Sequence, residues 1–186
     1  ILLDNSIYAL TKNQTSPTSP QGLATNTQPH GSFLPALNPL VATLGVTNAS
    51  FVAQSCDWVP GHLYATLRAA VQHRGFAFVR ILQRCPVWTP QIFEQAARQT
   101  DKTQILVHDD GIRDPEIEKI YGNQVPHDPT DLDAARRLAQ DSGVVRIGLF
   151  YRNESLARYD DVRHLPRHTV QEKLELLDAE LDRYVV

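Results

Sequence analysis

The sequence predicts an α/β protein whose open, mainly parallel sheet is flanked by helices. Three observations lead to this fold class. Short apolar runs, which are typical of buried strands, alternate with segments whose apolar residues recur at helical spacing. Hydrophobic residues make up 42% of the chain and charged residues 21%, as in an ordinary folded domain. The length of 186 residues fits about one domain, and no apolar stretch approaches the ~18 residues that would span a membrane.

In the first half of the chain, start and stop residues delimit the predicted elements. Pro39 suits the first turn of a helix that Gly45 ends. A second helix, which Gly75 ends, carries apolar residues at helical spacing: Leu63, Leu67, Ala70 and Val71. The predicted strands cover residues 1–4, 50–54 and 76–82, and the predicted helices cover residues 40–45, 60–73 and 90–98.

The second half of the chain, from about residue 101, is more charged and is expected to be an α/β extension over residues 101–186. We expect it to pack on the domain formed by residues 1–100 or on a partner subunit. The predicted strands here cover residues 104–107 and 144–151, and the helices cover residues 131–141 and 169–184, with another helix starting at Asp114. The last helix carries an apolar stripe, which predicts core packing or a subunit contact: Val170, Leu174, Leu177 and Leu181.

Between the first strand and the first helix lies a long polar stretch, over residues 5–39, that contains five of the 12 prolines. A structureless segment of this length inside a compact domain is usually either functional or disordered. It follows the carboxyl end of a strand, where α/β proteins place their chemistry. Its neutral oxygen and nitrogen groups, with the cation of Lys12, suit a phosphorylated ligand and a hard ion such as Mg²⁺. From the residues alone, an ordinary Ser/Thr/Pro surface loop remains the alternative.

The overall counts exclude several classes of protein. The formal net charge of −3 argues against a strongly basic nucleic-acid binder. Two cysteines cannot form a disulfide-rich scaffold or complete a four-cysteine metal site. The chain has no methionine, and it opens on apolar residues without the basic start of a signal peptide. We therefore expect a cytoplasmic protein, and a sequence that is the C-terminal part of a longer one.

One motif in the polar stretch carries a family resemblance. Residues 4–18 read DNSIYALTKNQTSPT, and this segment resembles the thiamine-diphosphate loop of the β subunits of 2-oxoacid:ferredoxin oxidoreductases. The likeness spans about the first ninety residues, with further matches at Gly31-Ser32, Asn38-Pro39, Phe51-Val52-Ala53, His73-Arg74-Gly75 and residues 81–86. It implies the thiamine-diphosphate-binding fold, with residues 1–100 as the C-terminal half of that domain and its N-terminal part absent. The end of the chain resembles, more loosely, the longer 2-oxoglutarate members of the family.

The resemblance implies metal ligands at three positions. The side chain of Asn5 and the main-chain carbonyl of Ile7 match two ligands of a Mg²⁺ ion. Cys85 matches the fourth cysteine ligand of a [4Fe–4S] cluster, whose other three cysteines lie near the N-terminus in the family. A buried, inert thiol is the alternative for Cys85. Cys56 matches no ligand position, and we interpret it as a packing residue.

Four further loop residues match cofactor and substrate contacts of the family. Leu10 and Thr11 match positions that pack against the diphosphate and the thiazolium, and Gln14 lies beside them in the same loop. Lys12 matches a basic residue beside the substrate pocket, where it would hold the carboxylate of the 2-oxoacid as a point charge. Lys12 is therefore the expected catalytic residue, and the other three are the expected cofactor-binding residues.

Two residues depart from the family pattern, because Ala9 and Asn13 stand where the family has glycine. Asparagine is the next best residue for a positive φ angle, so Asn13 fits a position of that kind. Alanine would be strained there, and we therefore expect that the φ angle of Ala9 is not positive.

The resemblance implies an enzyme that works only within a complex. It would decarboxylate a 2-oxoacid, foremost 2-oxoglutarate, with thiamine diphosphate and Mg²⁺, pass electrons through the [4Fe–4S] cluster to ferredoxin, and form an acyl-CoA. Its implied partners are an α subunit, the remaining N-terminal β segment, ferredoxin, the 2-oxoacid and coenzyme A. Two alternatives stay open: a pyruvate or broad-range 2-oxoacid enzyme, and a non-catalytic scaffold fragment that retains the fold. The sequence also leaves open whether His30, Cys56 or His108 contributes to the site.

Overall fold

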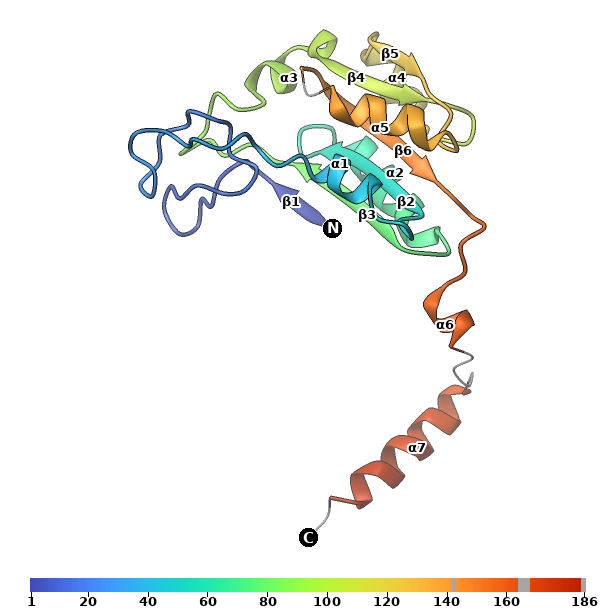
Figure 1. Ribbon diagram of the computed structural model, residues 1–186. Helices are drawn as coiled ribbons and strands as arrows, with labels where there is room; N and C mark the ends of the chain where they lie inside the picture. The colour runs from blue at the N-terminus through green and yellow to red at the C-terminus, as the bar shows by residue number, and fades with distance from the viewer. Residues whose placement is uncertain (142, 164–167, 185–186) are drawn as a thin grey trace. The chain divides into compact units, whose positions relative to one another are not determined.

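The computed structural model describes residues 1–141, 143–163 and 168–184 (Figure 1). The chain divides into two compact units, residues 1–156 and residues 157–186. Among the described helices, none combines the length and apolar character that crossing a membrane requires.

A six-stranded sheet forms the centre of the first unit. Its strands are β1 (Leu2–Asp4), β2 (Phe51–Cys56), β3 (Ala77–Leu82), β4 (Thr103–Val107), β5 (Gln124–Pro126) and β6 (Val145–Arg152). They lie in the order β1-β3-β2-β6-β4-β5, and every neighbouring pair is parallel except β2 with β6. The predicted mainly parallel α/β sheet is therefore confirmed.

The sheet runs across the boundary expected near residue 100. Strand β6 lies between β2 and β4, so it joins strands from both sides of that position. The compact unit instead ends at Leu156. The division into residues 1–100 and 101–186 stays a prediction. Residues 101–156 pack on residues 1–100, because β4, β5 and β6 belong to the same sheet as β1, β2 and β3.

The helices of the first unit cover both faces of the sheet. They are α1 (Pro39–Leu44), α2 (Pro60–Gln72), α3 (Glu94–Arg98), α4 (Pro115–Ile120) and α5 (Leu132–Gln140), with a 3₁₀ turn at Thr100–Lys102. Val52 packs with α1 and α5, whereas its neighbours Phe51 and Ala53 pack on the opposite face with α2 (Figure 1). This alternation is the period of two that a strand imposes on its side chains. The stripe predicted on α2 is confirmed for Leu63, Leu67 and Ala70, which contact this second cluster. It is wrong for Val71, which is 86% exposed.

One predicted helix boundary and one missing strand need correction. The helix expected over residues 90–98 begins only at Glu94, because Phe93 has a φ angle of 61° and cannot continue a right-handed helix. Strand β5 was not predicted, since it has three residues, of which one is proline.

The long stretch between β1 and α1 is folded by hydrogen bonds between hydroxyl groups and the backbone. Oγ1 of Thr15 lies 2.6 Å from Oγ1 of Thr25, and Oγ of Ser32 donates to the carbonyl of Pro20 at 2.6 Å. The side chain of Asn38 then caps α1, because its Oδ1 accepts from the amide of Leu40 at 3.1 Å. The Ser, Thr and Asn residues of this loop thus supply the contacts that an apolar core supplies elsewhere.

The second unit contains the short helix α6 (Tyr159–Val162) and helix α7 (Val170–Asp182). A capping box of Thr169 and Glu172 begins α7. The four residues of its predicted apolar stripe are each at least half exposed. Core packing and a subunit contact both stay predictions for this stripe.

Candidate functional site

The candidate site lies at the carboxyl ends of three neighbouring strands. Asp4 and Cys56 are both register partners of Leu82, so β1, β2 and β3 end at one edge of the sheet. The long loop leaves from β1 at this edge, and the turn that carries Cys85 follows β3. This is the edge at which open α/β sheets bind their ligands.

The two expected Mg²⁺ ligands lie on a tight turn directly after β1. Ser6, which separates them, has a φ angle of 61°, and its amide donates to Oδ1 of Asp4 at 3.0 Å. The amide of Ile7 donates to Oδ1 of Asn5 at 3.2 Å. The carbonyl of Ser6 is held by Oγ of Ser19 at 2.7 Å, whereas the carbonyl of Ile7 accepts no hydrogen bond from the described part of the chain.

This donor set fits a hard divalent cation. An amide oxygen and a free main-chain carbonyl oxygen, two residues apart on a fixed turn, are neutral oxygen ligands of the type that Mg²⁺ accepts. The described residues contain no group of three or more His, Cys, Asp or Glu side chains that could hold a metal. An ion bound here would therefore need acidic or phosphate oxygens from outside them.

Lys12 lies near the tip of a narrow loop that Tyr8 and Gln14 close. The amide of Tyr8 donates to the carbonyl of Gln14 at 2.9 Å, and the amide of Lys12 donates to the carbonyl of Ala9 at 3.0 Å. Asn13 has a φ angle of 62°, as its replacement of glycine predicts, and Ala9 is not among the residues with positive φ. Both expectations are confirmed. The positive φ of Lys12 itself, 69°, was not foreseen.

The tip of this loop exposes the side chains that were expected to meet cofactor and substrate. Leu10 is 97% exposed, Thr11 and Lys12 are exposed, and Gln14 is half-buried. Full exposure of a leucine leaves its apolar surface in water. The tip is therefore suited to contact a group that the described chain does not itself provide.

Cys85 lies in a turn that holds its sulfur with backbone N–H groups. The thiol is 7% exposed, and the amide of Trp88 donates to its Sγ at 3.5 Å. Burial alone would raise the pKa of this thiol, but the N–H groups of Trp88 and its neighbours and the hydroxyl of Thr89 together lower it. A thiolate stabilised in this way is chemically suited to be a metal ligand, and a surface pocket of about 570 Å³ opens beside it.

Thr89 connects the cysteine turn to the metal turn. Its Oγ1 lies 3.4 Å from the carbonyl of Asn5, and its amide donates to the carbonyl of Cys85 at 3.3 Å. Cys56 differs in its pKa, because it is fully buried and burial raises the pKa of its thiol to about 12. Its interpretation as a packing residue is confirmed.

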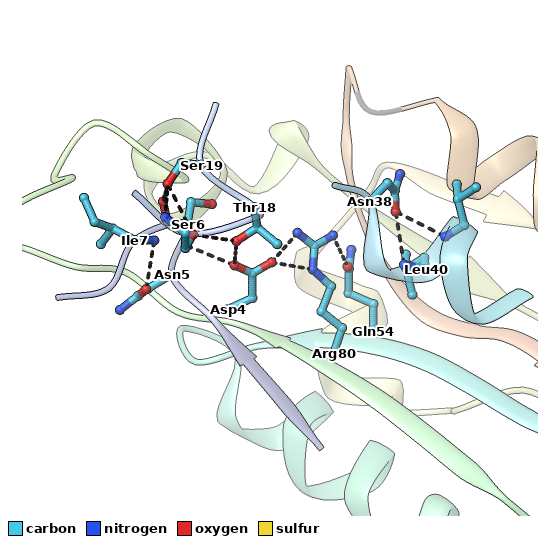
Figure 2. A network of polar contacts seen from close by, with 12 residues as sticks. Asp4, Asn5, Ser6, Ile7, Thr18, Ser19, Asn38, Leu40, Gln54 and Arg80 are labelled. Carbon is cyan, nitrogen blue, oxygen red and sulfur yellow. Dashed lines mark hydrogen bonds and ion pairs between the residues drawn. The ribbon is translucent and has the colours of Figure 1, made fainter. Parts of the chain in front are cut away.

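The structure also places residues at the site that the sequence did not single out. Asp4 binds Arg80, and the hydroxyl of Thr18 donates to Asp4 at 2.6 Å (Figure 2). Nη1 of Arg80 also donates to Oε1 of Gln54 at 3.1 Å. Neither histidine left open joins them: His30 is exposed in the loop, and His108 accepts from the amide of Asp110 at 3.1 Å.

Comparison with known proteins shows which proteins this chain is similar to. The family model described as "Thiamine pyrophosphate enzyme, C-terminal TPP binding domain" matches residues 1–81. The 2-oxoglutarate oxidoreductase subunit KorB of Mycobacterium tuberculosis is 40% identical over 106 residues, which are 57% of this chain and 28% of that protein. The 2-oxoacid:ferredoxin oxidoreductase subunit beta of a Sulfolobus species is 26% identical over 170 residues, 87% of this chain and 50% of that protein.

A solved structure agrees with these sequence matches. It is the 2-oxoglutarate:ferredoxin oxidoreductase from Magnetococcus marinus with 2-oxoglutarate, coenzyme A and succinyl-CoA bound. It superposes on this chain with a TM-score of 0.66 and 27% identity, covering 95% of this chain and 56% of that one. The chain is thus similar in sequence and fold to the β subunits of 2-oxoacid:ferredoxin oxidoreductases.

The chain spans about half, or less, of the length of these β subunits. The match to the TPP-binding domain contains the whole polar loop, from Asn5 to Asn38, strands β1 and β2, and all of β3 but its last residue. It ends at Ile81, four residues before Cys85. The description of the matched domain thus names thiamine diphosphate as its ligand, and it names no metal.

Proposed function

We propose that this chain supplies the C-terminal half of the thiamine-diphosphate site in a 2-oxoglutarate:ferredoxin oxidoreductase. The observation that carries the proposal is the turn after β1, where the side chain of Asn5 and the unoccupied carbonyl of Ile7 lie at the carboxyl edge of the sheet. These oxygens would bind Mg²⁺, and the ion would in turn bind the diphosphate. When bound, thiamine diphosphate supplies the electron sink that the decarboxylation of a 2-oxoacid requires.

The loop tip would serve the organic part of the cofactor and the substrate. Leu10 and Thr11 would pack against the diphosphate and the thiazolium, with Gln14 fixing the base of the tip through its bridge to Tyr8. The exposed ammonium of Lys12 would hold the carboxylate of the 2-oxoacid by charge. The positive φ of Lys12 and Asn13 supports this role, because strained backbone is often found at ligand-binding sites.

Cys85 would contribute one of the four thiolates of a [4Fe–4S] cluster. The N–H groups around its sulfur support a ligand role, as such hydrogen bonds also tune cluster potentials. The other three thiolates, the acidic Mg²⁺ ligand and the second wall of the cofactor site would come from an N-terminal β segment and an α subunit. We keep the cytoplasm as the expected compartment for this complex.

The overall reaction balances without further reagents. A 2-oxoacid anion, coenzyme A and two oxidised ferredoxins would give acyl-CoA, carbon dioxide, two reduced ferredoxins and one proton. The two electrons leave singly, which is why a one-electron carrier such as an iron–sulfur cluster is needed between substrate and ferredoxin.

Two observations favour 2-oxoglutarate over other 2-oxoacids. The relative from Mycobacterium tuberculosis, with 40% identity, is named for 2-oxoglutarate, and the Magnetococcus marinus enzyme was solved with this substrate. A pyruvate or broad-range enzyme is the second candidate, because relatives named only for 2-oxoacids match more of the chain. A scaffold that binds no cofactor is the third.

Assays of the intact complex separate these candidates. We expect thiamine diphosphate, magnesium and iron to purify with the complex, and ferredoxin to be reduced when 2-oxoglutarate and coenzyme A are both present. Pyruvate should support much slower reduction. Comparable turnover of pyruvate would replace 2-oxoglutarate by a broad range of substrates, and the absence of all three cofactors would leave only the scaffold.

A further inference from the structure

A buried ion pair links the sheet to the turn that carries the proposed Mg²⁺ ligands (Figure 2). Arg80 of β3 is the register partner of Leu2, so its side chain reaches two residues along β1 to meet Asp4. Its Nε and Nη2 donate to Oδ2 of Asp4 at 2.8 and 2.5 Å. The side chains of Arg80 and Asp4 are only 15% and 3% exposed, so water screens this pair weakly.

The other carboxylate oxygen of Asp4, Oδ1, accepts hydrogen bonds from residues of the loop. Oδ1 accepts from the amide of Ser6 at 3.0 Å and from Oγ1 of Thr18 at 2.6 Å. Ser6 is the residue with positive φ that separates Asn5 from Ile7. Four donors therefore occupy the Asp4 carboxylate, which makes it a support for the turn rather than a ligand itself.

The other end of the guanidinium is fixed by the centre of the sheet. Nη1 of Arg80 donates to Oε1 of Gln54 at 3.1 Å, and Nε2 of Gln54 donates to the carbonyl of Arg146 at 2.7 Å. Gln54 is 4% exposed. A continuous chain of hydrogen bonds thus runs from β6 through β2, β3 and β1 to the backbone of the loop.

We propose that Arg80 is a positioning residue for the Mg²⁺ and thiamine diphosphate of this site. By holding Oδ2 of Asp4, it directs Oδ1 toward Ser6 and so fixes the turn on which the oxygens of Asn5 and Ile7 lie. The ligands are then arranged before the cofactor arrives, and binding does not have to order them. This inference rests on the proposed function and names the residue that prepares the site for it.

The test measures cofactor binding in the intact complex. Thiamine diphosphate is titrated by calorimetry at several Mg²⁺ concentrations. Arg80→Gln is expected to raise Kd about tenfold or more, the size found for outer-shell partners of metal ligands, and to raise the Mg²⁺ concentration needed for half-maximal binding. At saturating cofactor, kcat should stay within about twofold of the wild type, because Arg80 touches neither cofactor nor substrate. Arg80→Lys, which keeps the charge, should recover part of the affinity.

Arg152→Gln is the control. It breaks another ion pair of the same sheet, whose half-buried arginine lies at the end of β6 and binds Asp110 and Glu154 instead of the loop. It should lower the melting temperature and leave Kd unchanged. Equal increases of Kd in both variants would reduce Arg80 to a purely structural role and overturn the proposal, as would wild-type Kd and Mg²⁺ dependence in Arg80→Gln.

Two further measurements keep the outcome decisive. If the complex does not assemble with Arg80→Gln, Thr18→Val provides the test, because it removes one donor from Oδ1 of Asp4 and leaves the ion pair. Thr18→Val should raise Kd about threefold, the loss of roughly one ordinary hydrogen bond. Wild-type affinity in Thr18→Val would overturn the proposal. Amide hydrogen exchange of residues 4–19, measured without cofactor, should be faster in Arg80→Gln. A wild-type complex that binds no thiamine diphosphate would refute the proposed function instead, while the exchange rates would still report on the turn.

Discussion

The hydroxyl oxygen of Ser55 lies 2.8 Å from Nδ1 of His62, and both side chains are fully buried where β2 meets α2. The second ring nitrogen, Nε2, has no hydrogen-bond partner in the described part of the chain. Burial lowers the pKa of His62 from 6.5 to about 4, although Asp114 opposes this shift. The imidazole is thus neutral in the folded protein near neutral pH.

This arrangement predicts a loss of stability in mild acid. Above about pH 6.5 His62 is neutral in both the folded and the unfolded chain, so it does not affect the balance. Between about pH 6.5 and pH 4 only the unfolded chain binds the proton, and the free energy of unfolding should fall by up to about 3 kcal/mol. Melting temperatures of wild type and His62→Gln, measured across this range, should differ in slope. Parallel curves would contradict the neutral, buried state of His62.

The two cysteines should differ in their effect on iron. Cys85→Ser should remove most of the iron from the complex and its visible absorption, because it would replace one of the four thiolates of the proposed cluster. Cys56→Ala should keep the iron and lower the stability by about 1 kcal/mol, since it only trims a packed core residue. Iron analysis of both purified variants provides the measurement. Full iron content in Cys85→Ser would exclude Cys85 as a ligand.

Lys12 should matter for the substrate and little for the fold. Lys12→Gln is expected to lower kcat/KM for 2-oxoglutarate about 10- to 100-fold, since a hydrogen bond to a charged group contributes about 1.5–3 kcal/mol. Lys119→Gln is the control, because Lys119 on the exposed helix α4 pairs with Glu116 and with no other side chain among the described residues. Steady-state kinetics of the complex give both values. Unchanged kcat/KM in Lys12→Gln would remove this residue from the substrate site.

Asn38 should stabilise the end of the loop and the packing of α1 on α5. Its Oδ1 caps α1, and its Nδ2 donates to the carbonyl of Ala139 at 2.7 Å. Asn38→Ala should lower the free energy of unfolding by about 1–2 kcal/mol. Thr47→Ala, at an exposed position, should change it by less than about 0.5 kcal/mol. Differential scanning calorimetry measures both, and equal values would contradict the capping role.

The sequence predicted those elements that local signals define. Proline and glycine bound α1 and α2, and apolar runs mark β2, β3 and β6, so these elements were found within a few residues. Strand β5 gives no such signal, because its three residues owe their conformation to pairing with β4. The start of α3 was misplaced for a similar reason, as the left-handed backbone of Phe93 leaves no trace in the spacing of apolar residues.

The same distinction holds at the site. Asn5, Ile7, Lys12 and Asn13 belong to one continuous motif, and the sequence therefore pointed to them directly. Arg80 was missed because its role depends on the strand order, which brings β1 beside β3 although 76 residues separate Arg80 from Asp4. A charged residue inside an apolar strand is costly to bury unless it is paired. The position of Arg80 between the apolar residues Val79 and Ile81 was therefore the sequence signal that could have indicated a buried, paired arginine.

The turn after β1 is proposed to bind Mg²⁺ and, through it, thiamine diphosphate. Calorimetric titration of the intact complex with thiamine diphosphate, with and without Mg²⁺, tests it for wild type, Asn5→Asp and Asn5→Ala. We predict Mg²⁺-dependent binding by the wild type, partial binding by Asn5→Asp, which keeps an oxygen ligand, and an affinity lower by about tenfold or more in Asn5→Ala. Wild-type affinity in Asn5→Ala, or binding that does not depend on Mg²⁺, would contradict the claim.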